Sequence, residues 1–334
     1  MDVVATTLLM LMIFGVQIAL PAVLLAWQAH GRDTNIVYWA LKHTAAWSYI
    51  YATTVAGLWL AAPWYAPHAL MVVSISLAAR TLPGAFRLWR QPRRGNEWVV
   101  LAARTAAAAV GVAALGVALQ GRALPAANAI IELEFPLRSG RYYIANGGAT
   151  TLVNEHVRML SSERLRRFRG ASYGVDIVAL NAFGFRASRP APEELEEYAI
   201  FGDAIYPPCE GVVVRVEDWL PDLVPPAVDR AHVAGNFVML ECGPEGDVQV
   251  LLAHMRSNSV KVHPGDYVTL DTKLGEVGNS GNSGEPHLHI HAQRPGEIWQ
   301  LFTAEPLPIR FDGRYLVRND RITSMHDRDD IIDD

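Results

Sequence analysis

Long apolar runs without charge occupy the first third of the chain, and they restrict its fold more than any other feature. Residues 3–27 carry no charged side chain and are long enough to cross a bilayer as one helix. A cleavable signal peptide would need a basic start and a shorter apolar run, and the first residues supply no basic side chain. We therefore expect a retained membrane helix here.

Three further apolar runs follow. Residues 43–63 and 98–119 predict two more spans, whereas residues 66–82 form a shorter run that also suits a buried soluble helix. Arg104 lies inside the last run, close enough to its start for its side chain to reach the membrane interface. The sequence thus predicts a multi-pass α-helical membrane anchor of about four spans over residues 1–122.

The loop before the last apolar run is the most basic loop of this region. It contains five arginines: Arg80, Arg87, Arg90, Arg93 and Arg94. Basic loops of membrane proteins stay in the cytoplasm, so the last helix runs outward. Everything after about residue 122 is therefore expected outside the cytoplasm, whether or not residues 66–82 span.

The remainder of the chain contains short β-branched segments bounded by Gly, Pro or Asp. Helical periodicity is weak, and residues 191–200 suit either a short helix or an acidic loop. We expect a mainly antiparallel β domain, sandwich-like or barrel-like, over residues 145–310. A linker and first strand precede it at residues 123–144, and an extension with an acidic tail follows at residues 311–334.

Charge and cysteines exclude two kinds of site. The formal net charge is -5 and the pI is near 6.1, which argues against nucleic-acid binding. Neither cysteine belongs to a CxxC pair, so a cysteine-based zinc site is not expected. Cys209 precedes one predicted strand and Cys242 ends the next. If these strands pair antiparallel in an oxidising compartment, a disulfide can form; two separate buried thiols are the alternative.

Residues 278–293, GNSGNSGEPHLHIHAQ, join a turn rich in Gly and Asn to histidines at every second position. A strand sends alternate side chains to one face, so His287, His289 and His291 face one way. Leu288 and Ile290 then face the core. Three imidazoles on one face suit zinc, although a half-buried strand with a polar outer face has the same pattern.

Several ordered motifs resemble the lysostaphin/LytM-type zinc metallopeptidases, which cleave peptide bonds in bacterial peptidoglycan. The glycine-rich turn and PHLH are one such motif. The others are YGVDIVAL (173–180), YPPCEGVVVRV (206–216) and LLAHMRSNSVKVHPGDYVTLDTKLGEVGNSG (251–281). Together they cover about residues 145–305 and are more specific than an isolated HxH. The resemblance implies the LytM-type peptidase fold.

The resemblance also implies roles for individual residues. Asp176 and His289 match zinc ligands, and His254 and His287 match the two catalytic histidines beside the open coordination position. Zinc held by three protein ligands lowers the pKa of a bound water to about 7, and the hydroxide attacks the scissile carbonyl. One histidine would take the proton and the other would stabilise the oxyanion, and the sequence does not assign the two roles.

The chain departs from this family at the first ligand. The expected histidine lies four residues before the aspartate, where this chain has Ser172, a poor zinc ligand. His156 is the candidate third ligand, with an ordinary loop histidine as the alternative. His291 stays unassigned. His232 and His263 are interpreted as loop residues without a role.

The resemblance predicts a zinc metalloendopeptidase in a bacterial inner membrane, with its C-terminal domain outside the cytoplasm. Its partners are then the lipid bilayer and peptidoglycan peptides or another peptide substrate. The alternative is a catalytically inactive domain that binds and regulates other cell-wall enzymes, which Ser172 favours. The presence of Asp176, His254, His287 and His289 together favours the enzyme.

Overall fold

The computed structural model describes residues 11–30, 33, 35–87, 97–126, 129–243, 246–296 and 301–325. The chain divides into two compact units. The helical unit contains the residues up to Trp59 and Trp64–Gln120, and the β unit contains Leu60–Pro63 and everything from Gly121 onward.

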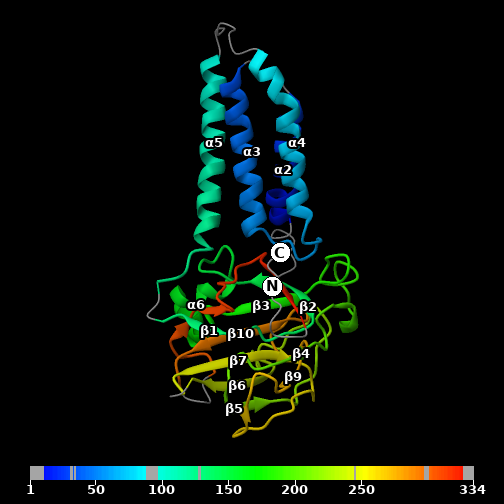
Figure 1. Cartoon of the computed structure of the whole chain (residues 1–334), viewed down its shortest axis with the longest axis vertical. Coiled ribbons are helices and arrows are strands. Elements are labelled where there is room, and N and C mark those ends of the chain that lie inside the picture. The colour runs from blue at the N-terminus through cyan, green and yellow to red at the C-terminus, as the bar shows by residue number, and fades with distance from the viewer. Residues whose placement is uncertain are drawn as a thin grey trace. The chain divides into compact units, whose positions relative to one another are not determined.

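Four α-helices and one π-helical turn make up the described part of the helical unit (Figure 1). They are η1 (Gly15–Ala19), α2 (Leu20–Ala29), α3 (Ile36–Ala56), α4 (Ala66–Arg87) and α5 (Glu97–Gln120). Three helical stretches are long and apolar enough to cross a membrane: Leu11–Ala29, Ala66–Phe86 and Trp98–Gln120. They correspond to three of the four predicted runs; residues 3–10 of the first run lie outside the described residues.

Residues 43–63 do not form one helix, contrary to the prediction. α3 begins earlier, where the Asn35 side chain accepts a hydrogen bond from the Tyr38 N–H, and it ends at Ala56. Gly57 leaves the helix with extended ψ while its N–H still donates to the Thr53 carbonyl. Residues 57–65 then form bends and turns. α3 is not among the candidate spans of the described residues.

A charged cluster lies inside the helical unit. Lys42 of α3 is fully buried, and its Nζ lies 2.7 Å from Asp33 Oδ2. Arg104 of α5 lies 2.5 Å from Asp33 Oδ1 and forms an ion pair with it. Buried charges are tolerated only when they are paired, which explains this arrangement. Residues 88–96, with Arg90, Arg93 and Arg94 of the predicted basic loop, lie outside the described residues, whereas Arg80 and Arg87 lie within α4 and not in a loop.

One nine-stranded sheet dominates the β unit, and all its pairs are antiparallel. Its order is β13-β2-β3-β10-β7-β6-β5-β8, with β11 also pairing with β10. The bounds are β13 (Arg321–Ser324), β2 (Gly140–Asn146), β3 (Val175–Ala179), β10 (Leu288–Gln293), β7 (Val248–Met255), β6 (Asn236–Cys242), β5 (Gly211–Glu217), β8 (Tyr267–Val268) and β11 (Pro306–Leu307).

Shorter elements complete the β unit. β1 (Ile131–Leu133) pairs in parallel with β12 (Ile309–Phe311), and β4 (Ala204–Ile205) pairs antiparallel with β9 (Gly275–Glu276). The helical turns are η2 (Glu155–Val157), α6 (Arg158–Ser161), η3 (Glu163–Ala171) and η4 (Leu195–Glu197), the last within the segment predicted as a helix or loop. The prediction of a mainly antiparallel β domain is confirmed.

The two faces of the sheet bury different groups. The larger core contains Leu252 of β7 together with Leu288 and Ile290 of β10. Because side chains alternate along a strand, His289 and His291 lie on the other face. That face carries a smaller apolar cluster of Ala234, Phe237, Met239, Leu251 and Ala253, against which Phe302 packs. A polar site can therefore form on this second face without interrupting the main core.

A disulfide joins Cys209 to Cys242 with a Cα–Cα distance of 5.9 Å. Cys209 lies two residues before β5, and the antiparallel register pairs Gly211 with Cys242. The covalent bond thus links the start of β5 to the end of β6. Such a bond belongs in an oxidising compartment.

Asp203 allows the pH dependence of this fold to be tested. Its Oδ2 accepts a hydrogen bond from the Tyr142 hydroxyl at 3.3 Å, and burial raises the pKa of its carboxyl to about 6. A carboxyl whose folded pKa is raised binds its proton more tightly in the folded state. Stability is therefore lost as the pH rises from about 4 to about 6.

We predict that Asp203→Asn stabilises the protein at pH 7.5 by about 1 to 2 kcal/mol, allowing for solvent screening of a partly exposed group. The amide keeps an acceptor for Tyr142 without a buried charge. The gain should shrink as the pH falls from 6 toward 4. Thermal unfolding of the full chain in detergent measures this difference in stability between the variant and the wild type. A difference that does not change with pH would contradict a role for the buried Asp203 charge.

Candidate metal centre

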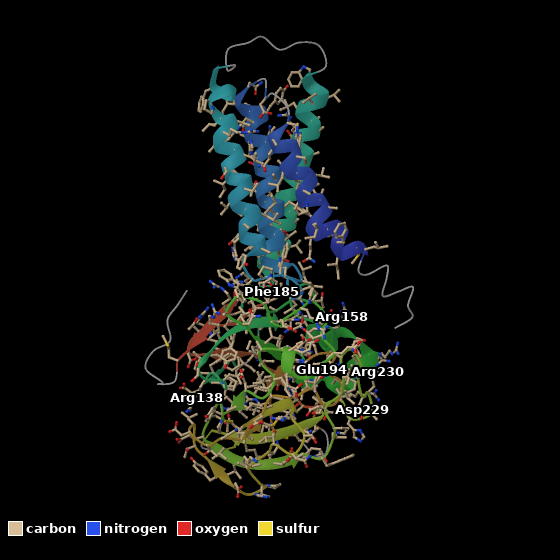
Figure 2. All side chains as sticks on the ribbon, turned by 90° about the vertical axis from the view of Figure 1, so that its right-hand side faces the viewer. Arg138, Arg158, Phe185, Glu194, Asp229 and Arg230 are labelled. Carbon is tan, nitrogen blue, oxygen red and sulfur yellow. A yellow bond between two sulfur atoms is a disulfide. The ribbon has the colours of Figure 1, made fainter. Side chains whose placement is uncertain are left out.

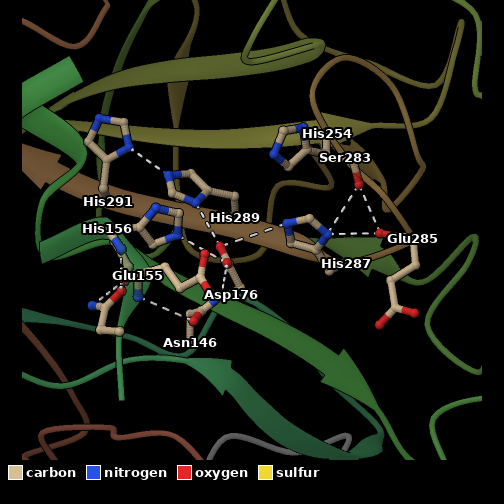
Figure 3. A network of polar contacts seen from close by, with 12 residues as sticks. Asn146, Glu155, His156, Asp176, His254, Ser283, Glu285, His287, His289 and His291 are labelled. Carbon is tan, nitrogen blue, oxygen red and sulfur yellow. Dashed lines mark hydrogen bonds and ion pairs between the residues drawn. The ribbon is translucent and has the colours of Figure 1, made fainter. Parts of the chain in front are cut away.

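Three adjacent strands place the first candidate ligands in one row (Figure 3). The register pairs Asp176 of β3 with His289 of β10, and His289 with Ala253 of β7. Asp176 and His289 therefore share the second face, and His289 Nδ1 lies 2.8 Å from Asp176 Oδ1. Gly174 makes room for this imidazole, because a Cβ there would lie 2.6 Å from His289 Cε1.

His156 reaches the same carboxylate from outside the sheet. It lies on η2, where the Asn154 side chain accepts a hydrogen bond from the His156 N–H. Its Nε2 lies 3.0 Å from Asp176 Oδ2, and Figure 3 shows its ring beside that of His289. The structure therefore brings the candidate third ligand to the other two.

This group suits a zinc ion. One donor atom from each of His156, Asp176 and His289 lies within 4.8 Å of the other two. A tetrahedral zinc with bonds of about 2.0 to 2.2 Å needs its donors roughly 3.3 Å apart, so small side-chain movements suffice. Two imidazoles and one carboxylate also form a ligand set that catalytic zinc uses.

Ser172 takes no part in this group. Its side chain is fully buried, and its hydroxyl donates to the Arg169 carbonyl at 2.6 Å, at the end of η3. The serine thus completes a turn, and its oxygen is already engaged. The missing ligand of the family pattern is not supplied at this position.

A β-bulge explains the position of His254. Asn236 pairs with Met255 and Phe237 pairs with Ala253, so His254 is an extra residue in β7 with a φ of 64°. Such a residue re-aims its side chain, and both Ala253 and His254 line the cavity above the sheet. His254 Nδ1 lies 2.9 Å from the Ser280 carbonyl, to which it must donate. Its Nε2 is left with a lone pair.

His287 is oriented by the turn before β10. Its Nδ1 lies 2.8 Å from the Glu285 carbonyl and 3.1 Å from Ser283 Oγ. The opposite nitrogen, Nε2, lies 3.8 Å from Asp176 Oδ1. The rings of His254 and His287 have their centroids 4.8 Å apart. The two predicted catalytic histidines therefore lie side by side next to the three candidate ligands.

His291, which the sequence left unassigned, supports His289. It is fully buried, its ring lies against Phe302, and its Nδ1 is 3.0 Å from His289 Nε2. When His289 Nε2 donates to His291, the Nδ1 of His289 presents its lone pair to a metal. His232 and His263 are exposed outside this group, and each pairs with a nearby aspartate, Asp229 and Asp266.

Asn146 is a site residue that sequence analysis missed. Its Nδ2 donates to Asp176 Oδ2 at 2.8 Å. A second bulge, in β2, places it there: Ile144 pairs with Ile177, and Asn146 pairs with Asp176. Strand alternation cannot reveal such a shift, and no motif that we identified includes this asparagine.

Charge and burial set the protonation states of the centre. The neighbouring His156 and His287 outweigh burial and hold the pKa of Asp176 well below its usual range. Burial lowers the pKa of His289, and burial together with His287 and His289 lowers that of His254. Burial opposes the charge on His156, but the Asp176 carboxylate outweighs it and raises the pKa. The carboxylate is therefore ionised, and His289 and His254 are neutral.

A cavity of about 490 Å³ opens above these residues. All five candidate site residues line it, together with residues of η2, α6 and η3. Arg158 of α6, labelled in Figure 2, is one of them. A second cavity of about 360 Å³ shares the wall formed by Phe168, Val233, Ala234 and Phe302. The two cavities are therefore neighbours.

Comparison with known proteins agrees with this geometry over part of the chain. The family model of Peptidase family M23 matches residues 197–300, which include His254, His287 and His289. Asp176 and His156 precede the matched segment. No curated protein matches the chain.

Several solved structures are similar. A zinc-containing peptidase from Vibrio cholerae is 18% identical, with 40% of this chain and 28% of that chain covered and a TM-score of 0.24. The lysostaphin catalytic domain from Staphylococcus simulans is 22% identical, with 35% and 81% covered and a TM-score of 0.20. A complex of SpoIIIAH and SpoIIQ is 13% identical, with 52% and 95% covered and a TM-score of 0.30.

The chain spans 28%, 37% and 36% of the length of the first three structures that it matches. The lysostaphin/LytM-type resemblance is confirmed by the family match, which is confined to the middle part of the β unit. Residues 197–300 of this chain therefore carry a metallopeptidase-type domain of peptidase family M23.

Proposed function

We propose that this protein is a membrane-anchored zinc metalloendopeptidase that cleaves peptide bonds in peptidoglycan. The observation that carries the proposal is the convergence of His156 on Asp176 and His289. It supplies a third ligand where Ser172 cannot. The family match over residues 197–300 supports the class of reaction.

His156, Asp176 and His289 would hold the zinc. When bound, zinc polarises a carbonyl group and lowers the pKa of a coordinated water. The ionised Asp176 is already in the form that a cation requires. The neutral His289 would move its proton from Nδ1, which bonds to Asp176, to Nε2, which faces His291, and His156 would release its proton on binding.

His254 and His287 would move the protons. The bond from His254 Nδ1 to the Ser280 carbonyl leaves the Nε2 lone pair free to accept a proton from the attacking water. The bond from His287 Nδ1 to the Glu285 carbonyl fixes the other ring. His287 would stabilise the substrate oxygen that gains negative charge.

The two cavities would accommodate an extended peptide across the site. The three candidate spans would anchor the chain in a bacterial inner membrane. The five arginines of residues 80–94, of which Arg80 and Arg87 lie in the C-terminal part of α4, would keep the C-terminal end of α4 in the cytoplasm. The β unit would then lie outside, where peptidoglycan is found. The disulfide between Cys209 and Cys242 supports this placement.

One observation favours a second function. Ser172 replaces the first ligand of the family pattern and its hydroxyl is directed to the Arg169 carbonyl. A domain that binds no metal could still bind a cell-wall enzyme and regulate it. Metal content separates the two functions.

We predict that the purified full chain binds about one zinc ion and that His156→Ala weakens binding by roughly 100-fold or more, because one of three ligands is lost. Ser172→Ala should keep the metal. Zinc content and a zinc titration in detergent measure both. A wild type that binds no zinc under any condition would end the enzyme proposal, and unchanged binding by His156→Ala would remove His156 from the ligand set.

We predict that His254→Gln lowers kcat on a cross-linked peptidoglycan peptide by roughly 10² to 10⁴, the usual contribution of a general base. Zinc content should stay at the wild-type level, because His254 is not a ligand. His263→Gln, an exposed loop variant, is the matched control. Full activity of His254→Gln would show that another group takes the proton.

For topology, we predict that a reporter enzyme fused after residue 125 is active only when it folds outside the cytoplasm. A phosphatase that needs disulfides and a reporter that fluoresces only in the cytoplasm form a complementary pair. Fluorescence of the second fusion would refute the proposed orientation.

A further inference from the structure

Arg318 lies beyond the segment that matches the peptidase family, yet it is buried beside the metal centre. It is only 4% exposed. Its guanidinium donates to three acceptors: Nε to the Ala145 carbonyl at 2.9 Å, Nη1 to the Leu152 carbonyl at 2.8 Å and Nη2 to Asn146 Oδ1 at 2.6 Å. One rigid, permanently charged group thus links the end of β2 to the loop that follows it.

That loop, residues 147–157, carries His156. Asn154 holds this loop from one side, because the Asn154 Nδ2 group donates to the carbonyls of Gly148 and Gly174 at 3.2 and 3.0 Å. Arg318 holds it from the other side through Leu152. The position of the His156 backbone is therefore fixed by two polar side chains, one of them from the C-terminal segment.

Arg318 also acts on Asp176 through Asn146. Because Asn146 Oδ1 accepts from Arg318, the Nδ2 group of this amide must face Asp176 Oδ2, to which it donates at 2.8 Å. Glu155 N–H donates to the same Oδ1 at 3.4 Å. The arginine thereby determines which end of the amide meets the carboxylate.

The backbone around Arg318 is itself firmly held. The Arg318 N–H donates to the Gly147 carbonyl at 3.2 Å, and the Asn319 N–H donates to the Ile144 carbonyl at 2.9 Å. The Ile144 N–H in turn donates to the Asp320 carbonyl at 3.0 Å. A turn that is hydrogen-bonded to β2 therefore fixes the position of the guanidinium.

We propose that Arg318 is a positioning residue of the metal centre, holding Asn146 and the loop of residues 147–157 so that His156 can replace the ligand absent at Ser172. This inference rests on the proposed function. Removing the guanidinium takes its donor from the Ala145 and Leu152 carbonyls and leaves Asn146 Oδ1 with only the long bond from the Glu155 N–H, so the loop rearranges to reach water. The ligand geometry is then lost although the ligands remain.

The test compares zinc affinity with stability in the full chain purified in detergent. Zinc dissociation constants come from competition with a chelating dye, and thermal midpoints come from the metal-free protein. The variants are Arg318→Met, Arg318→Lys and Ile322→Ala. Ile322, on β13, is 5% exposed, and its truncation destabilises the same end of the sheet through a cavity without touching the centre.

Arg318→Met should weaken zinc binding by roughly 10- to 100-fold, as loss of a group that orients metal ligands does. Arg318→Lys should weaken it less than Arg318→Met does, because the ammonium keeps the positive charge and can still donate, although it cannot span all three acceptors. Ile322→Ala should lower the thermal midpoint and leave the dissociation constant unchanged. If Arg318→Met does not fold, Arg318→Lys decides by the same comparison.

Two outcomes would overturn this inference without affecting the proposed function. In the first, the wild type binds zinc and the Arg318 variant binds it equally well. In the second, Ile322→Ala weakens zinc binding as much as the Arg318 variant does. A wild type that binds no zinc overturns the proposed function and this inference together.

Discussion

The carboxylate of Asp176 is the interaction on which the candidate site depends. It lies 2.8 Å from His289 Nδ1 and 3.0 Å from His156 Nε2, and it accepts a bond from Asn146. Burial opposes its charge, and the surrounding histidines outweigh that cost. Without this negative charge, two imidazoles from distant parts of the chain would have no common partner, and a cation would have no charge to bind.

The β-sheet supplies this carboxylate with neighbours, and its irregularities complete the set. Regular pairing puts Asp176 and His289 in one row on one face. Regular alternation would send His254 to the face opposite Ala253, and only the bulge in β7 returns it to the site. The bulge in β2 does the same for Asn146. The site thus lies where two bulges interrupt the regular alternation of side chains in the sheet.

Local patterns explain what could be predicted from the sequence. Alternation in residues 287–291 separated the histidines from Leu288 and Ile290, and ordered motifs indicated Asp176 and His254. The end of α3 at Ala56 was missed, because apolar composition continues through a turn beginning at Gly57. Arg318 and Asn146 were missed because they lie 172 residues apart, and their contact exists only in the folded chain.

The central claim is that His156 completes a zinc site with Asp176 and His289. Anomalous X-ray diffraction at the zinc absorption edge, on crystals of the zinc-loaded chain, tests it most directly. We expect one anomalous peak within about 2.0 to 2.2 Å of His156 Nε2, the Asp176 carboxylate and His289 Nδ1. A zinc peak held by Asp176 and His289 with His156 turned away, or a peak elsewhere, would contradict it.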